Sequence, residues 1–271
     1  MTISSVLQKD QTIPFLEFKN ITMYIGTLRV LDSISVTIPA GEHIAILGPN
    51  GSGKSSFVKA VTREYHPVVQ GREITYRIWG QDRWDVFKLR SHIGIVSSDL
   101  MYRCSREMSG REMILSGFFS SIGLFNHMVT PEMERRTNEI GTLLEIQHLM
   151  NRKIPKMSFG EARRFLIGRA LVHNPKVLIL DEPTNSLDLH ALHTLRQTMR
   201  IIARSGTMIM LVTHNLPDII PEISRVIMIH NGRIYKDGRK EDLLTDELIS
   251  RLFSVQVTIH QEEGYYYATG Y

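Results

Sequence analysis

Residues 48–55 read Gly-Pro-Asn-Gly-Ser-Gly-Lys-Ser, which fits the pattern G-x-x-x-x-G-K-[ST] of a phosphate-binding loop. The apolar run at 43–47 is short enough to be a buried strand, and residues 55–61 are expected to form a helix. Strand, glycine-rich loop and helix, in that order, are the context in which this pattern binds phosphate. The stretch therefore predicts a site for a triphosphate.

Each part of this loop has a physical use. Its three glycines let the backbone bend so that successive N–H groups point at an anion, and the helix N-terminus adds partial positive charge. Lys54 can reach the terminal phosphates, and the Ser55 hydroxyl can bind a magnesium ion. The residues expected to contact the nucleotide are Gly48, Pro49, Asn50, Gly51, Ser52, Gly53, Lys54, Ser55 and Ser56.

Composition is that of an ordinary globular protein. The 271 residues suffice for one large or two small domains, with 42% hydrophobic and 22% charged residues. A net charge of +4 fits a nucleotide binder or a protein near an anionic membrane, but we interpret it as a mixed surface. The single cysteine, Cys104, excludes an internal disulfide and a cysteine-based zinc site.

Membrane and secretion signals are not found in the sequence. Residues 1–14 are polar and lack the apolar core of a signal peptide. No apolar run approaches the ~20 residues that span a bilayer. We therefore expect a cytoplasmic protein, and any membrane part of its machinery would come from another chain.

The first third of the chain is predicted to contain an antiparallel sheet. Residues 15–18, 34–38 and 73–79 alternate apolar with polar side chains, as half-buried strands do. Residues 1–13 are interpreted as a loose leader.

The middle of the chain is predicted to be a helical insertion. Between 100 and 157, apolar residues recur at helical spacing, in 110–118 and again in 131–149. Beyond it, helices predicted at 160–173 and 189–203 alternate with buried strands at 177–180 and 208–212. Such alternation around a phosphate loop indicates an α/β fold with a largely parallel sheet.

Two hairpins are expected near the C-terminus. Asn231-Gly232 lies between apolar strands at 226–229 and 233–235 and suits a type I′ turn. The tail, 253–271, alternates at 255–259, turns at Gly264 and continues with three tyrosines, Tyr265 to Tyr267. Adjacent residues of a strand face opposite sides, so we do not expect these tyrosines to form one base-stacking surface.

Two acids follow the buried strand at 177–180. Strand ends in such sheets line the ligand crevice. Asp181 can hold a magnesium ion, usually through a water, and Glu182 can polarise an attacking water as a general base.

A third turn could also bind an anion. Ser158 to Glu161 precede a helix, so the Ser158 hydroxyl, the Gly160 N–H and the helix dipole point to one place. Taken alone, this stretch is equally an ordinary N-cap.

Together these motifs resemble the ATP-binding-cassette (ABC) ATPases, over roughly residues 15–240. Residues 48–55 match the Walker A motif, and Asp181 with Glu182 match Walker B and its catalytic glutamate. The other matches are Ser158-Phe159-Gly160-Glu161 for the signature motif, Ser186-Leu187-Asp188 for the D-loop, His214 for the switch histidine and Tyr24 for the aromatic that stacks on adenine.

The resemblance implies a fold as well as a chemistry. The fold is that of P-loop NTPases: RecA-like, with a mostly parallel sheet, an N-terminal antiparallel β-subdomain and an α-helical insertion at about 99–160. The nucleotide-binding domain would cover 1–252, and 253–271 would be a short C-terminal extension like a β-hairpin.

The resemblance also implies that two such domains pair head to tail, with ATP between the Walker A motif of one and the signature motif of the other. Lys54, Glu182 and His214 would be catalytic, and Ser55, Asp181 and Ser98 would hold Mg²⁺. Ser158 and Gly160 would contact the partner's γ-phosphate, and Glu161 and Asp188 would also belong to the nucleotide site.

Three positions depart from the family's pattern. Ser98 stands where the family has a glutamine that contacts magnesium and water, and the shorter serine reaches as far only through a water. Phe159 replaces a glycine of the signature motif, which predicts a modified dimer contact, and Glu161 replaces a glutamine. The segments 96–98, 113–124 and 163–164 are similar to a subgroup of molybdate-type ATP-binding proteins, which does not name a substrate.

The function implied is the ATPase subunit of an importer-like ABC system, working as a dimer on a separate permease and without direct nucleic-acid contact. The alternative is a soluble ABC ATPase that acts on a protein, ribosome or nucleic acid. A single cassette and the absence of long coiled-coil segments in the sequence favour transport. A regulatory domain with weak hydrolysis is a third possibility, raised by Ser98.

Overall fold

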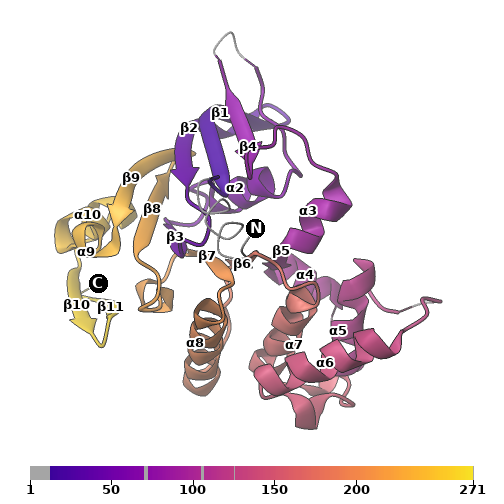
Figure 1. Cartoon of the computed structure of the whole chain (residues 1–271). Coiled ribbons are helices and arrows are strands. Elements are labelled where there is room, and N and C mark those ends of the chain that lie inside the picture. Colours follow the sequence, from indigo (N-terminus) through magenta and orange to yellow (C-terminus); the bar gives the residue numbers. More distant parts are fainter. Residues whose placement is uncertain (1–12, 70–72, 105–106, 125, 271) are drawn as a thin grey trace, which may run out of the picture. The chain divides into compact units, whose positions relative to one another are not determined.

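The computed structural model describes residues 13–69, 73–104, 107–124 and 126–270, so nearly all of the predicted leader lies outside it. The chain divides into two compact units, whose strands and helices are labelled in Figure 1. The first comprises Met1–Arg90 and Met208–Tyr271, and the second comprises Ser91–Thr207.

The first unit contains the predicted antiparallel sheet, in the order β2-β1-β4. β1 (Leu16–Ile25) and β2 (Leu28–Ile38) are longer than the strands expected at 15–18 and 34–38, and β4 (Thr75–Ile78) is shorter than expected. The first two strands extend because a two-residue turn, with Gly26 at φ 59°, joins them into one hairpin. Tyr24 therefore lies inside β1.

Four more strands of this unit follow the α/β prediction. β7 (Met208–Thr213), β3 (Ile44–Leu47) and β8 (Arg225–His230) run parallel, and β9 (Arg233–Arg239) runs antiparallel to β8. Every residue of β3 and β7 is buried. Such strands are expected to read as continuous apolar runs, because both of their faces are covered.

The hairpin between β8 and β9 confirms the prediction from Asn231-Gly232. Both residues have positive φ, 49° and 73°, as a type I′ turn requires. Two further helices of this unit are α2 (Lys54–Val61), at the phosphate loop, and α10 (Asp246–Phe253), near the C-terminus.

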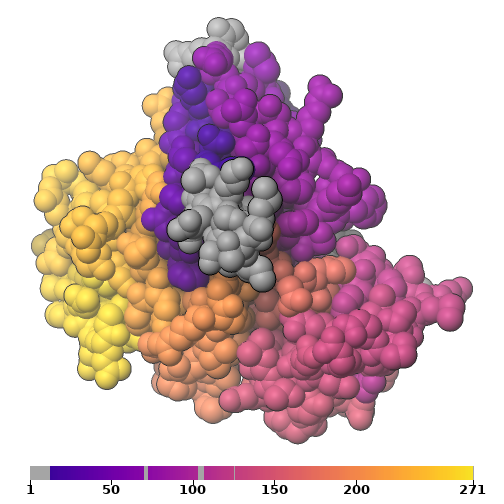
Figure 2. Space-filling model, in the orientation of Figure 1, coloured from indigo at the N-terminus to yellow at the C-terminus, as the bar shows by residue number. Residues whose placement is uncertain are grey.

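The C-terminal segment contains a short helix, α9 (Lys240–Leu243), and a second hairpin, β10 (Thr258–Glu262) with β11 (Tyr265–Thr269). The strand starts later than the predicted 255, because the N–H groups of Val255 and Val257 bond back to Ser250 of α10. β11 packs on the turn η4 (Leu216–Asp218), with Tyr266 buried, while β10 is mostly exposed. Figure 2 shows this segment in yellow at the molecular surface.

In the second unit β5 (Ile93–Val96) and β6 (Val177–Asp181) run parallel. Helices are found where the insertion was predicted: α4 (Ser98–Cys104), α5 (Gly110–Ser116), α6 (Pro131–Leu143) and the short turns η1 (Gly117–Phe119), η2 (Gln147–Leu149) and η3 (Ile154–Lys156). The helix expected over 131–149 ends at Leu143, since Glu145 takes a left-handed conformation. α7 (Phe159–Leu171) and α8 (Leu189–Arg204) lie within two residues of their predicted bounds, and α3 (Val86–His92) crosses the division between the units.

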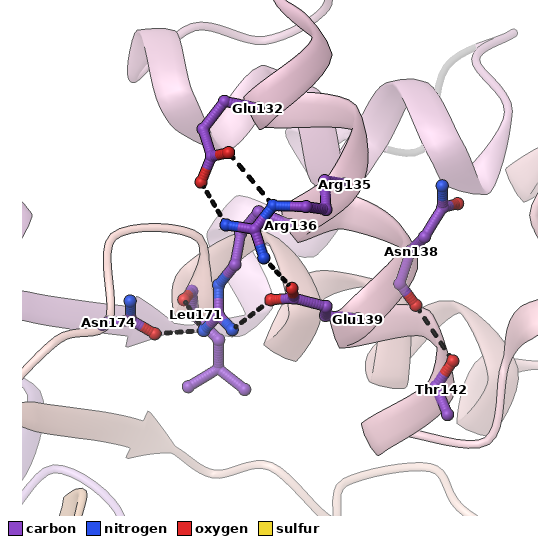
Figure 3. Close-up of polar contacts among 8 residues, drawn as sticks. All are labelled: Glu132, Arg135, Arg136, Asn138, Glu139, Thr142, Leu171 and Asn174. Atoms are coloured by element: carbon purple, nitrogen blue, oxygen red, sulfur yellow. Dashed lines mark hydrogen bonds and ion pairs between the residues drawn. The ribbon is translucent and has the colours of Figure 1, made fainter.

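The exposed side of α6 carries the ion-pair network of Figure 3. Arg135 contacts Glu132 one turn earlier and Glu139 one turn later. Arg136 donates a hydrogen bond of 3.3 Å to the carbonyl of Leu171 and another to Asn174. These bonds attach α6 to the C-terminal end of α7.

Among the helices in the described part of the chain, none combines the length and the apolar character that crossing a bilayer needs.

Candidate functional site

The phosphate loop, residues 48–55, connects β3 to α2 in the first unit, as the sequence predicts. Gly51 and Gly53 have φ of 77° and 107°, which L-residues with side chains rarely adopt. Gly53 is also the N-cap of α2 and has no side chain with which to cap it. The N–H groups of the first turn therefore stay available to a bound anion.

Lys54 is 4% exposed and its ammonium lies inside the loop. Nζ donates hydrogen bonds to the carbonyls of Gly48, at 2.9 Å, and Pro49, at 3.1 Å. The loop backbone thus positions the Lys54 ammonium, which the sequence predicts to contact the terminal phosphates. Asn50, Gly51 and Ser55 are exposed, Pro49, Gly53 and Ser56 are half-buried, and Ser52 is buried.

The loop is packed against backbone that lies far away in sequence. The Gly232 N–H donates to the carbonyl of Ser52, at 2.8 Å. A Cβ on Gly53 would lie 2.9 Å from the carbonyl oxygen of Val30, and a Cβ on Gly48 would collide with that of Ile229. Gly48 is therefore required by close approach, and Gly53 by close approach as well as by conformation.

A histidine, His43, stands directly before the strand that leads into the loop. The Nδ1 atom of His43 accepts a hydrogen bond from the Ile209 N–H of β7, at 3.1 Å. Burial lowers the pKa of His43, and the Glu222 carboxylate opposes this only in part. A neutral ring is the form that can accept this bond.

Two more candidate residues lie in the first unit. Tyr24 is 36% exposed and is paired across the hairpin with Arg29 of β2. His214 follows β7 and is half-buried. The turn beside it is fixed by Thr213, whose hydroxyl donates to Asp218 at 2.8 Å and accepts from the Asn215 N–H at 2.9 Å.

The acidic pair is in the second unit, at the end of β6. Asp181 is the last residue of the strand, and Glu182 follows it with φ 48°. The Asn185 side chain donates a 2.7 Å hydrogen bond to Oε2 of Glu182. Sequence reasoning missed Asn185, although its spacing of three residues from Glu182 is that of a local side-chain contact.

The signature turn, residues 158–161, forms a capping box at the start of α7. The Ser158 hydroxyl accepts from the Glu161 N–H at 3.2 Å, and the Glu161 carboxylate accepts from the Ser158 N–H at 2.8 Å. Phe159 is 67% exposed. A Cβ on Gly160 would lie 2.6 Å from that of Ala191, so this glycine packs against α8.

Asp188 and Ser98 also stand at helix starts of this unit. Asp188 is the N-cap of α8, where its carboxylate accepts from the Ala191 N–H at 2.8 Å. Because Gly160 packs on the same Ala191, the signature turn and the D-loop meet there. Ser98 is the exposed first residue of α4, and the neighbouring Ser97 hydroxyl accepts from the Leu100 N–H.

A magnesium ion suits the donors available. Within the described residues no three His, Cys, Asp or Glu side chains gather as a metal cluster. Mg²⁺ in nucleotide sites is commonly held by one or two protein oxygens, with phosphates and waters as the other ligands. A hydroxyl such as that of Ser55 and a carboxylate such as that of Asp181 are donors of this kind.

The family model that describes ABC transporters matches residues 31–185. The chain belongs to the ABC transporter family. That assignment confirms the family predicted from the motifs, and the fold is the P-loop NTPase fold of its cassettes. Members of the family bind ATP and hydrolyse it, so the chain is an ATPase.

Individual relatives agree with this assignment. The ABC transporter ATP-binding protein YlmA of Bacillus subtilis is 30% identical over 90% of this chain and 92% of its own length. The hemin import ATP-binding protein HmuV of Photobacterium damselae is 31% identical over 97% and 98%. The molybdate-type subgroup is not among these names.

Solved structures show the same fold. The ADP conformation of an ATP-binding cassette of an ABC transporter has a TM-score of 0.74 at 24% identity, covering 89% of this chain and 98% of that one. An inward-facing transporter of the metal-chelate type has a TM-score of 0.73 at 22% identity, covering 94% and 96%.

Proposed function

We propose that the chain is the ATP-hydrolysing subunit of an importer-like ABC system, which dimerises on ATP and docks on a separate membrane permease. The observation that carries the proposal is the phosphate loop, with its uncapped helix and its buried Lys54, in a chain of this family. The subunit would be cytoplasmic and bound to the inner face of the membrane through the permease.

In this proposal the first unit binds the nucleotide. The adenine stacks on Tyr24, and the phosphates lie on residues 48–56, with Lys54 at the terminal ones. Ser55, Asp181 and Ser98 hold Mg²⁺, Ser98 through a water because its side chain is short. The ion, when bound, neutralises charge on the phosphate oxygens.

Hydrolysis is assigned to Glu182 and His214. Glu182 takes up a proton from the attacking water as general base, and His214 holds the γ-phosphate and that water. The bond from Asn185 fixes one oxygen of the Glu182 carboxylate and so orients the carboxylate. The role of Lys54 is to stabilise the charge that develops on the γ-phosphate.

The second half of each site would come from a second copy of the chain. Ser158, Gly160, Glu161 and Asp188 lie at two helix starts that meet at Ala191, and such helix starts suit an anion brought by a partner. Phe159 would then contact the partner at the edge of that site. The cassette proper would be 1–252, with 253–271 as an extension.

Import is favoured by the names of the relatives, since hemin import proteins are among them. The relatives named above are all parts of transporters, which supports transport over a ribosome- or nucleic-acid-directed ATPase. The molybdate-type subgroup stays a prediction from the sequence.

The substitution Glu182→Gln tests the mechanism. The variant should bind ATP normally, lose nearly all hydrolysis and accumulate as an ATP-bound dimer in size-exclusion chromatography. Glu247→Gln, at an exposed ion pair of α10, is the matched control and should behave as the unaltered chain. Normal turnover by Glu182→Gln would overturn the role of that glutamate.

The permease is tested by fractionation of cells that express the chain. We expect part of the protein to sediment with the membranes. It should be released from them without a detergent that dissolves the lipid. A pool found wholly on ribosomes would favour the alternative.

A further inference from the structure

An ion pair joins the antiparallel sheet of the first unit to the β8–β9 hairpin. Arg233, at the start of β9, donates from Nε to Oδ2 of Asp32 in β2, at 2.7 Å. Arg29 reaches the same oxygen with Nη2, at 3.2 Å, and the Ser33 hydroxyl donates to the other. The bond from Arg233 lowers the pKa of Asp32, so the carboxylate is charged at neutral pH.

The backbone beside this pair leads directly to the phosphate loop. The Asp32 N–H donates to the carbonyl of Gly232, at 2.8 Å, and the Gly232 N–H donates to that of Ser52, also at 2.8 Å. Gly232 has φ 73°, and a Cβ on it would lie 2.8 Å from the carbonyl oxygen of Val30. One turn residue thus bonds to β2 on one side and to the loop on the other.

The loop has a physical need for such support. Its glycines give it more conformational freedom than other residues would, and ordering that freedom when phosphate binds costs affinity. Three of its carbonyls are already fixed: those of Gly48 and Pro49 by Lys54, and that of Ser52 by Gly232. Whatever fixes Gly232 therefore helps to hold the loop in its binding shape.

We infer that Asp32 and Arg233 are positioning residues for nucleotide binding: their ion pair fixes the Asn231–Gly232 turn, and the turn fixes the phosphate loop. The inference rests on the proposed use of this loop as the ATP site. Arg29 joins the network to the strand position opposite Tyr24, so the pair also connects the base end of the proposed site to its phosphate end.

The arginine side of the pair is placed to affect binding more than overall stability. The Arg233 side chain is 66% exposed and borders a hollow of about 480 Å³ lined by Arg29, Asp32, His230, Asn231 and Arg233, whereas the Asp32 side chain is only 8% exposed. Replacing the exposed arginine costs little folding free energy, because solvent screens its charge and Arg29 and Ser33 still contact Asp32, whereas changing the buried carboxylate also costs stability. A large effect on nucleotide affinity from Arg233→Gln would therefore come through the loop.

The same hairpin supplies a matched control at its other end. Arg225, at the start of β8, bonds to Asp237 at 2.7 Å and to Glu42 at 2.9 Å. This second network also joins β8 to β9, and its arginine is only 19% exposed. Asp237→Asn thus weakens the hairpin without touching the turn at Gly232.

The test compares Arg233→Gln, Asp32→Asn and Asp237→Asn in the full chain. We expect the first two to raise the Kd for a fluorescent ATP analogue about tenfold, the effect of one charge-assisted contact, with an unchanged melting temperature in Arg233→Gln and a lower one in Asp32→Asn, whose carboxylate is buried. The KM for ATP should rise in parallel and kcat should stay within about twofold, since the loop loses the same support in the ground state and in the transition state. Arg233→Lys keeps the charge and should restore part of the affinity.

Each result has a defined reading. Unchanged Kd with a lower melting temperature means a merely structural pair and overturns the inference, as does an equal loss of affinity in Asp237→Asn. If Arg233→Gln fails to fold, Asp32→Asn and Arg233→Lys decide by the same criteria. A chain that binds no ATP before any substitution would overturn the proposed function and this inference with it, whereas normal binding by every variant would overturn the inference alone.

Discussion

The phosphate loop and the signature turn both lead into a helix N-terminus, but they are held in different ways. The loop is fixed from a distance: Gly232 bonds to Ser52, and Val30 closes on Gly53. The signature turn is fixed by its own side chains, through the reciprocal bonds of Ser158 and Glu161. The first depends on the folded sheet, and the second on four consecutive residues.

This difference has a consequence for binding. At α2 the cap is a glycine, so the N–H groups of the first turn are open to an anion as the loop stands. At α7 the Ser158 hydroxyl already accepts a backbone N–H, and the Glu161 carboxylate adds negative charge beside it. The Ser158 hydroxyl can still donate to a phosphate, but the Glu161 carboxylate opposes one, so we expect the loop to bind alone and the turn to bind only when a second copy brings nucleotide to it.

The largest expected effect is at the loop, from Lys54→Ala. The change removes the ammonium that would face the terminal phosphates and leaves the carbonyls of Gly48 and Pro49 without its bonds. ATP affinity should fall roughly 10- to 100-fold, since a hydrogen bond to a charged group contributes about 1.5–3 kcal/mol. Equilibrium titration with a fluorescent ATP analogue measures this.

Lys59→Ala is the control for that substitution. Lys59 lies on the same helix, is half-buried, and contacts Tyr65 rather than the loop. It loses the same charge, so its ATP affinity should stay within about twofold of the unaltered chain if only the position of the charge matters. Equal losses in both variants would mean that net charge, not the loop, determines affinity.

A smaller and different effect is expected at the signature turn, from Ser158→Ala. Loss of an N-cap costs about 1 kcal/mol of stability, measured by denaturant unfolding. ATP affinity at low protein concentration should not change, whereas hydrolysis should fall about tenfold, because the partner's phosphate loses one donor.

The chain offers a matched control for this cap. Ser109 and Glu112 form a second capping box, at the start of α5. Ser109→Ala should lower stability by the same about 1 kcal/mol and leave hydrolysis intact. Equal loss of hydrolysis in the two variants would contradict a phosphate-binding role for Ser158.

The same contrast explains what the sequence could predict. The Ser158 cap and the type I′ turn at Asn231-Gly232 depend on neighbouring residues, and both predictions are confirmed. The contacts of Gly232 with Ser52, and of Arg233 with Asp32 across 201 positions, depend on how strands are ordered in space. No local pattern carries that order, so the support of the loop was not predicted although the loop itself was.

Some boundaries of strands and helices were not predicted, for a related reason. Tyr24 was predicted as the adenine-stacking residue without a strand around it, because β1 loses its alternation beyond Phe18, where bulges shift the register with β2. Likewise Ser98 is predicted as a magnesium ligand without a helix at its position, and it is the first residue of α4. In both cases pairing or capping by neighbours decided the boundary.

The smallest expected effect concerns pH, and it falls on the loop's side of the comparison. His43 accepts the Ile209 N–H through Nδ1, across 166 positions, and burial lowers its pKa below the usual 6.5. In the unfolded chain His43 takes up a proton near its usual pKa, and in the folded chain only at lower pH. Stability should therefore be full above about pH 6.5 and decrease as pH falls through the folded pKa. Melting temperatures between pH 7.5 and 5 measure this, with one hydrogen bond, about 1 kcal/mol, at stake.

His43→Gln has no proton to gain and should flatten that part of the profile, while Ser158→Ala should keep the slope of the unaltered chain. An unchanged slope in His43→Gln would assign the pH dependence to other groups. It would mean that the bond between His43 and Ile209, before the loop, does not make stability depend on pH.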